Sequence, residues 1–160
     1  MVFEDLGQGV LNNAYEGYNT SLFAYGQTGA GKSYSMIGYG NNKGIVPITC
    51  QELFKKVEQG DGETKYEVKF SMLEIYNEQV RDLMSKNNPK GGLAVRQNPK
   101  LGLFYVGDLK KVPVASYGEI ERRIDEGTNN RTGLLLINLI IFWLIFQFGI
   151  IRILLMNILS

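Results

Sequence analysis

The residues best suited to chemistry in this chain form one short stretch, residues 26–33, which reads GQTGAGKS. The stretch fits the pattern G-x-x-x-x-G-K-[ST], which is typical of a loop that wraps around a polyphosphate. Its glycines let the backbone approach the phosphates closely and adopt dihedral angles that other residues avoid. Lys32 would reach the β- and γ-phosphates, and the Ser33 hydroxyl would ligate Mg²⁺. The stretch therefore predicts a site for a nucleoside triphosphate and its magnesium ion.

A loop of this kind requires a buried strand before it and a helix after it. Residues 20–25 are apolar and rich in aromatic side chains, so they predict the strand, and residues 33–37 predict the first helical turn. Strand and helix together favour phosphate binding over the alternative, a glycine-rich turn that carries an incidental lysine. The residues assigned to phosphate binding are Gly26, Gln27, Thr28, Gly29, Ala30, Gly31, Lys32 and Ser33.

Helices are predicted before and after the phosphate-binding stretch. Apolar residues at helical spacing predict a helix over 2–15 and another over 48–59. A third helix begins at Ser116, where Ser116 and Glu119 form a capping box, and it ends or bends at Gly127. The predicted buried face of the first helix comprises Val2, Leu6, Val10, Leu11 and Ala14.

Extended structure is predicted mainly in the middle of the chain. Residues 65–76 alternate between apolar and polar side chains and predict a strand. A strand end and a short helix follow over 74–84. Residues 93–96 and 104–106 predict a short hairpin, and 112–114 a further extended piece.

The composition narrows the possible functions. The chain has 160 residues, enough for one domain, and its formal net charge of +1 gives no bulk attraction to nucleic acid or membranes. The absence of histidine from the sequence excludes histidine-ligated zinc and Ser-His or Cys-His catalysis. Cys50 is the single cysteine, so an intracellular location is compatible with the sequence. The first residues are acidic and lack the basic region of a signal peptide.

The composition changes abruptly at Gly133. Residues 134–151 contain no charge, and Asn138 and Gln147 are their polar side chains. The run is long and apolar enough for a membrane-spanning helix. Its β-branched residues also suit an aggregation-prone β-strand. A third interpretation is translation into an intron or a shifted reading frame. No basic cluster follows the run, as would be expected beside a cytoplasmic membrane face, so membrane contact is expected only through this tail, if at all.

Residues 2–132 resemble the kinesin motor domain. Three blocks carry the resemblance and occur in the order of that family: NTSLFAYGQTGAGKSYSM at 19–36, SMLEIYNEQVRDL at 71–83, and the region from Val95 to Thr132. The Tyr-Ser-Met that follows Ser33 and the Asn-Pro…Gly hairpin at 98–102 look most like the kinesin-3 branch.

The resemblance implies an α/β fold of the P-loop NTPase type, in which helices flank both faces of a central, mostly parallel sheet. It implies ATP hydrolysis coupled to movement on microtubules, with ATP and Mg²⁺ as cofactors, tubulin as partner, and a cytoplasmic, cytoskeletal location. Tyr34 matches the position whose ring packs against adenine. The hairpin near 96–105 corresponds to a region that touches tubulin. Lys100, Lys110 and Lys111 are basic enough to meet an acidic filament, or they form an ordinary solvated surface.

The sequence departs from the family pattern at both ends. The opening strand with its Arg-x-Arg-Pro element, which forms the other side of the adenine pocket, does not occur here. The run from Gly133 replaces the Asn-x-x-Ser-Ser-Arg-Ser-His segment of the first switch, and the Asp-Leu-Ala-Gly-x-Glu of the second switch is missing. Positioning and charge stabilisation do nearly all the work of phosphoryl transfer. We therefore expect no catalytic residue in this chain and no filament-stimulated turnover.

The predicted organisation is a partial motor domain over 1–132 followed by an apolar tail of uncertain origin over 133–160. The predicted function is that of an ATP-binding fragment of a microtubule motor. The alternatives are a catalytically inactive nucleotide- or tubulin-binding short form, and a protein anchored in a membrane by residues 134–151. A partial sheet would leave unpaired edges and bare apolar faces, so we expect the isolated chain to aggregate.

Overall fold

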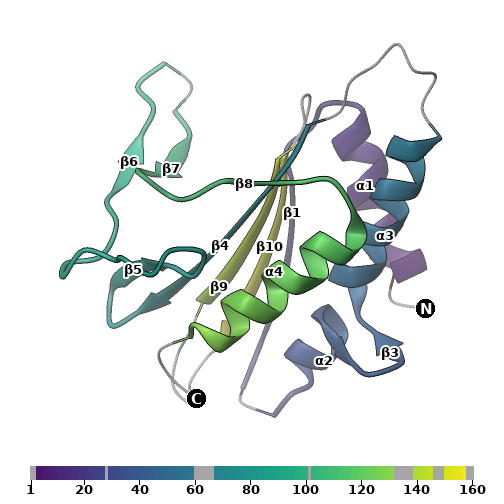
Figure 1. The fold of residues 1–160 in the computed structure, drawn as a ribbon, viewed down its shortest axis with the longest axis horizontal. Coiled ribbons are helices and arrows are strands. Elements are labelled where there is room, and N and C mark those ends of the chain that lie inside the picture. The colour runs from purple at the N-terminus through teal and green to yellow at the C-terminus, as the bar shows by residue number, and fades with distance from the viewer. Residues whose placement is uncertain are drawn as a thin grey trace.

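The structure is a computed structural model that describes residues 3–27, 29–59, 67–100 and 102–131, together with the backbone of 139–145 and 150–157. Its helices gather on one side of a central sheet, as Figure 1 shows. The helices are η1 (Phe3–Gly7), α1 (Gln8–Tyr15), α2 (Lys32–Met36), α3 (Ile45–Glu58) and α4 (Tyr117–Asn129). The strands of the central sheet are β1 (Thr20–Gly26), β4 (Val68–Tyr76), β5 (Gln79–Asp82), β8 (Val112–Val114), β9 (Leu139–Ile145) and β10 (Ile150–Asn157).

The central sheet has six strands in the order β1-β10-β9-β4-β5, and β8 pairs with β4 beside this path. β1 and β10 run parallel, whereas the pairs β10–β9, β9–β4, β4–β5 and β4–β8 are antiparallel. The α/β class is confirmed, but the expectation of a mostly parallel sheet is wrong for the described strands. Two of the four antiparallel pairs, β4–β5 and β9–β10, join strands close together in the sequence, and short connections produce antiparallel neighbours.

The two faces of the sheet are covered differently. One face and the helices share a large core, to which β4 contributes Val68, Phe70 and Met72 and β1 contributes the partly buried Leu22 and Ala24. The opposite face carries a small cluster of Leu73, Val80 and Leu109. On β1 the alternate positions Phe23 and Tyr25 are 63% and 67% exposed. Among the described residues helices pack on one face, so the expectation of helices on both faces is not met.

The first helical segment forms where it was predicted but turns a different face to the core. Residues 3–7 adopt a π-helix before the regular turns of α1 begin. This wider turn rotates the segment, so that Phe3 and Gly7 are buried and Leu6 is 51% exposed. Leu11 and Ala14 are buried as predicted, and Val10 is partly buried. The prediction that Leu6 faces the core is therefore wrong, and Val2 lies outside the described residues.

Helices α3 and α4 contribute buried residues to the same core as α1. Helix α3 begins at Ile45, three positions before the predicted start, because a first helical turn tolerates the missing N–H of Pro47. Helix α4 begins with the predicted cap, in which Glu119 N donates to Ser116 Oγ over 3.3 Å. The Glu119 carboxylate accepts a 2.7 Å bond from Ala115 N. The helix continues through Gly127 to Asn129, so the prediction that it ends at Gly127 is wrong, and the bend stays a prediction.

The stretch after β4 forms a hairpin rather than the predicted short helix. Strand β5 pairs antiparallel with β4, from Tyr76 opposite Gln79 to Leu73 opposite Asp82. Asn77 and Glu78 make the turn with φ angles of 47° and 61°, the left-handed region that two-residue hairpin turns require. The predicted hairpin farther along the chain is confirmed as β6 (Val95–Gln97) and β7 (Phe104–Val106).

The described parts of the apolar tail are strands of the central sheet. β9 pairs with β4, from Lys69 opposite Ile145 to Ile75 opposite Leu139, and β10 pairs with β1. This contradicts the spanning-helix interpretation of 134–151 over its described residues and agrees with the strand-forming alternative. None of the helices within the described ranges has the length and apolarity needed to cross a membrane. The origin of the tail and the boundary at residue 132 stay predictions.

Candidate functional site

The phosphate-binding stretch forms a tight loop between the end of β1 and the start of α2. Gly26, Gly29 and Gly31 have φ angles of 144°, 84° and 85°, a region that residues with side chains rarely adopt. Gly31 precedes the first residue of α2, and Ser35 N donates to Gly31 O over 2.9 Å. The glycine spacing of the motif is thus explained by backbone dihedrals. Thr28 lies outside the described residues.

The Lys32 side chain folds back over this loop. Its ammonium donates to the carbonyl oxygens of Gly26 at 2.8 Å and Gln27 at 2.6 Å. These bonds link the start of α2 to the end of β1, and they hold the positive charge of Lys32 at the loop. A bound polyphosphate would compete with two neutral carbonyl acceptors for this ammonium, and a charged acceptor forms the stronger hydrogen bond.

The remaining described residues of the loop are open to solvent. Gln27, Gly29, Ala30 and Ser33 are exposed, so the loop is accessible to a ligand from solvent. Within the described ranges, no cluster of three or more His, Cys, Asp or Glu side chains could hold a metal ion. Ser33 lies in the first turn of α2 and stays the predicted magnesium ligand.

Tyr34 lies beside a cavity of about 460 Å³. The ring is 52% exposed, and the cavity wall also includes Phe3 from η1 and Ile45 and Ile48 from α3. Asn41 and Asn42 add amide groups to this lining. Apolar walls with a few polar groups are typical of sites for flat organic ligands. The structure thus places a ligand-sized space next to the phosphate-binding loop, on the side of Tyr34.

Residues 37–44 join α2 to α3 and contact Tyr34 through the ring of Tyr39. The short strands β2 (Gly38–Tyr39) and β3 (Asn42–Lys43) make this segment a small hairpin. The ring centroids of Tyr39 and Tyr34 lie 6.2 Å apart, with their planes tilted by 34°. This separation is within the range of favourable aromatic pairs.

The second strand of this hairpin is fastened to α4. Lys43 Nζ donates to the Tyr117 hydroxyl at 2.9 Å and lies 4.5 Å from the centre of the same ring. The Tyr117 hydroxyl donates to Glu121 Oε1 at 3.0 Å. The bond to Tyr117 raises the pKa of Lys43, and burial raises the pKa of Tyr117, so both groups keep their protons at neutral pH.

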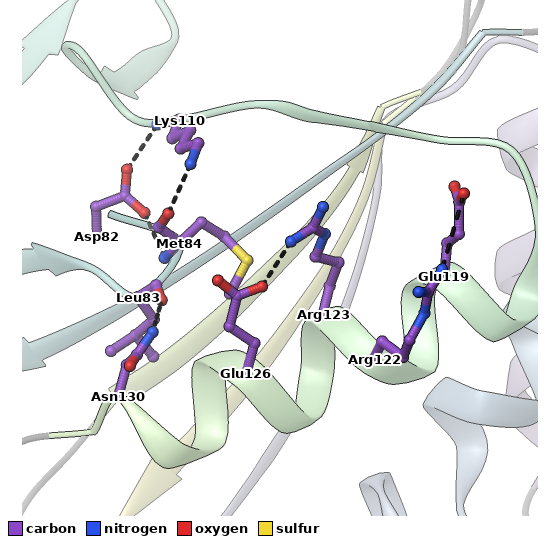
Figure 2. Close-up of polar contacts among 9 residues, drawn as sticks. All are labelled: Asp82, Leu83, Met84, Lys110, Glu119, Arg122, Arg123, Glu126 and Asn130. Atoms are coloured by element: carbon purple, nitrogen blue, oxygen red, sulfur yellow. Dashed lines mark hydrogen bonds and ion pairs between the residues drawn. The ribbon is translucent and has the colours of Figure 1, made fainter. Parts of the chain in front are cut away.

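A separate polar cluster ties the loop after β5 to β8 and to the end of α4, as Figure 2 shows. Asp82 is 3% exposed and accepts the backbone N–H groups of Met84 at 2.8 Å and Lys110 at 2.7 Å. Lys110 Nζ donates to Met84 O at 3.0 Å. Asn130 Nδ2 donates to Leu83 O at 2.9 Å, which fixes the last turn of α4. The cluster therefore joins the loop after β5, the segment before β8 and the end of α4.

This cluster changes the interpretation of the basic residues. The Lys110 ammonium donates to Met84 O while the residue itself is exposed, so Lys110 contributes both to this cluster and to the basic surface. Lys100 and Lys111 are exposed. The hairpin β6–β7 projects away from the helices (Figure 1) and exposes Phe104 by 63% and Tyr105 by 43%.

The sequence analysis did not identify Phe3 and Tyr39 as residues of the site. The π-turn that brings Phe3 to the cavity has no clear signature in the hydrophobic pattern, which favoured Leu6. Tyr39 sits among glycines and asparagines, between the helical turn predicted at 33–37 and the helix predicted over 48–59. The sequence carried no distinctive signal for Tyr39, because apolar side chains exposed singly are common on protein surfaces.

The chain is similar in sequence to known proteins of one family. Residues 1–134 match the sequence model of the family described as Kinesin motor domain. Kinesin-like protein KIF28P of Homo sapiens is 53% identical over 131 residues, which cover 82% of this chain and 13% of that protein. Kinesin-like protein KIF1A of Rattus norvegicus is 46% identical over 134 residues, covering 82% of this chain and 8% of KIF1A. The kinesin-3-like prediction is consistent with these relatives.

A solved structure shows the same fold. KIF14 with ADP, in complex with a microtubule, superposes with a TM-score of 0.81 at 30% identity, over 99% of this chain and 51% of that one. The chain therefore spans about half of a solved motor structure, and a much smaller part of the full-length relatives.

Proposed function

Because the chain belongs to the kinesin motor-domain family, we propose that it is the ATP-binding part of a microtubule-based motor. Residues 26–33 bind the phosphates in this proposal, with Lys32 on the β- and γ-phosphates and Ser33 on Mg²⁺. Tyr34 packs against the adenine ring. Hydrolysis and movement along the filament belong to the longer motor protein of which this chain would form part.

One observation carries the proposal, namely the loop between β1 and α2. Three glycines there adopt positive φ angles, and the Lys32 ammonium lies over the loop rather than pointing to solvent. This combination suits a ligand that presents several closely spaced anionic oxygens. Mg·ATP would supply the phosphoryl group and the cation that neutralises its charge. The cavity beside Tyr34 supports a site for the base on the adjoining side.

Titration with Mg·ATP, followed by calorimetry, tests the phosphate site. We expect the wild-type chain to bind and Lys32→Ala to lose at least about tenfold in affinity, because a charge-assisted contact is removed. Lys55→Ala is the matched control, since Lys55 is an exposed lysine on α3 whose partner is Glu52. Equal affinities of Lys32→Ala and the wild type would contradict the proposal.

We further propose that the partner is tubulin and that the protein is located on cytoplasmic microtubules. The hairpin β6–β7 supports this, because it exposes aromatic residues next to basic ones such as Lys100. Exposed lysines are attracted to an acidic filament surface, and salt weakens that attraction.

Cosedimentation with microtubules tests the partner. We expect the double variant Lys100→Glu, Lys111→Glu to pellet less than the wild type at low salt, and the difference to shrink as salt rises. The double variant Lys55→Glu, Lys56→Glu changes the net charge by the same amount on α3, which lies away from the hairpin (Figure 1), and should pellet like the wild type. Loss of binding in both variants alike would point to net charge rather than to this hairpin.

A further inference from the structure

The segment 37–44 packs closely against the end of α2, beside the proposed nucleotide site. Gly38 has a φ of 81°, and a side chain there would overlap the backbone of Asn42 and Gly44. A side chain at Gly44 would likewise overlap the backbone of Met36, and Gly44 N donates to Ile37 O at 2.9 Å. The hairpin is therefore packed directly against the end of α2, the helix that carries Tyr34.

Two contacts on opposite strands of this hairpin fix its position. On β3, Lys43 is bound to Tyr117 of α4 by the 2.9 Å hydrogen bond and by its place over the ring. On β2, the Tyr39 ring contacts the ring of Tyr34. These contacts fix the backbone at Tyr39, which is itself 68% exposed, and its ring lies on one side of the Tyr34 ring, where it limits the positions that ring can adopt.

The lining of the cavity shows on which side of Tyr34 the Tyr39 ring lies. Tyr34 lines the 460 Å³ cavity, whereas Tyr39 is not part of its wall. Tyr39 therefore touches Tyr34 from outside the space that a ligand would fill. A half-exposed tyrosine on a short helix loses rotamer freedom when it stacks on a ligand, and a ring that already restricts it reduces that loss.

We propose that Tyr39 is a positioning residue that holds the Tyr34 ring at the base side of the nucleotide site. The inference rests on the proposed function, because it assigns Tyr34 to the base of the bound nucleotide. It assigns no contact between Tyr39 and the ligand. Tyr39 then contributes to the affinity for ligands that have a base and contributes nothing to the affinity for the phosphates alone.

Affinities for two ligands, Mg·ATP and magnesium with inorganic tripolyphosphate, test this inference in the full chain. We expect Tyr39→Ala to weaken ATP binding about three- to tenfold and to leave tripolyphosphate binding unchanged. Tyr39→Phe keeps the ring and should restore the wild-type affinity for ATP. Tyr34→Ala should show the same selective loss, and Lys32→Ala should weaken both ligands.

The outcomes separate this inference from the function on which it rests. If Lys32→Ala weakens both ligands while Tyr39→Ala leaves ATP affinity unchanged, or weakens both ligands equally, the positioning role is wrong and the nucleotide site stands. Failure of Tyr39→Phe to restore ATP binding also overturns the role, because the ring would then not be the active part. If the wild type binds neither ligand, the proposed function and the inference fail together.

Discussion

The carboxylate of Asp82 accepts the backbone N–H of Lys110 at 2.7 Å, which joins β5 to the segment entering β8. Its other oxygen accepts Met84 N, and the backbone of Asp82 itself bonds to the Asn88 side chain in both directions, at 2.7 Å and 2.9 Å. Figure 2 shows the carboxylate between the two segments. One buried carboxylate thus joins the loop after β5 to the segment before β8.

Replacement of this carboxylate should destabilise the fold. Asp82→Asn keeps the shape but sets an amide N–H against a backbone N–H, so a buried donor loses its acceptor. We expect the free energy of unfolding to fall by about 2–3 kcal/mol, measured by urea denaturation. Asp125→Asn, at an exposed position of α4, should leave it within about 0.5 kcal/mol. Matching midpoints for the two variants would show that the Asp82 bonds contribute little.

Glu78 should be replaceable with a gain in stability. It adopts a φ of 61° in the turn between β4 and β5, which is costly for a residue with a side chain, and it follows an asparagine. Glu78→Gly creates the Asn-Gly pair that such turns prefer, so we expect a gain of about 0.5–1 kcal/mol in urea denaturation. Gln79→Gly, one position later in β5, should instead destabilise the strand. A lower stability for Glu78→Gly would mean that its side chain makes a stabilising contact that outweighs the strain.

Gly127 marks the closest approach of α4 to the sheet. A Cβ at this position would overlap the Met72 sulfur and lie 2.8 Å from Met84 Cε. We expect Gly127→Ala to cost about 1–3 kcal/mol through overpacking, despite the better helix propensity of alanine. Gly118→Ala in the first turn of the same helix meets no atom within 4 Å and should stabilise or be neutral. Thermal unfolding of both variants checks the pair, and a stabilised Gly127→Ala would show that the methionines move aside.

The thiol of Cys50 should be inert in the folded chain. Burial raises its pKa from 9.0 to about 12, so the folded state disfavours the thiolate. Because the folded pKa is the higher one, this group stabilises the fold fully below pH 9 and loses that contribution as pH rises towards 12. We expect no reaction with a thiol reagent at pH 8 until denaturant is added.

The pH dependence provides the control for this thiol. Relative to Cys50→Ala, the wild type should lose stability more steeply between pH 9 and pH 11, measured by denaturation at each pH. Parallel curves for the two proteins, or rapid labelling of the native thiol at pH 8, would contradict the buried, protonated state.

Local signals predicted the glycine-rich loop and the helix cap better than the sheet. The glycine spacing around Lys32 and the cap at Ser116 are decided by a few neighbouring residues, so the sequence alone located both. The hairpin at Asn77 and Glu78 was missed, because a glutamate in a left-handed turn contradicts the usual preference. Strand order depends on contacts between distant segments, and no local pattern indicated that β10 would lie beside β1. Tyr39 was missed for a related reason, since its partner Tyr34 is defined by the fold of the intervening hairpin.

The parallel pair of β1 and β10 also determines when the site can be completed during synthesis. Thr20 of β1 pairs with Ile151, roughly 130 residues later in the chain. A ribosome needs on the order of ten seconds to translate that interval. During this time the phosphate-binding loop has been made, but β1 lacks the neighbour that pairs with it in the finished sheet. The nascent chain would then expose an apolar strand edge, which is a natural binding site for a chaperone, until the last strand emerges.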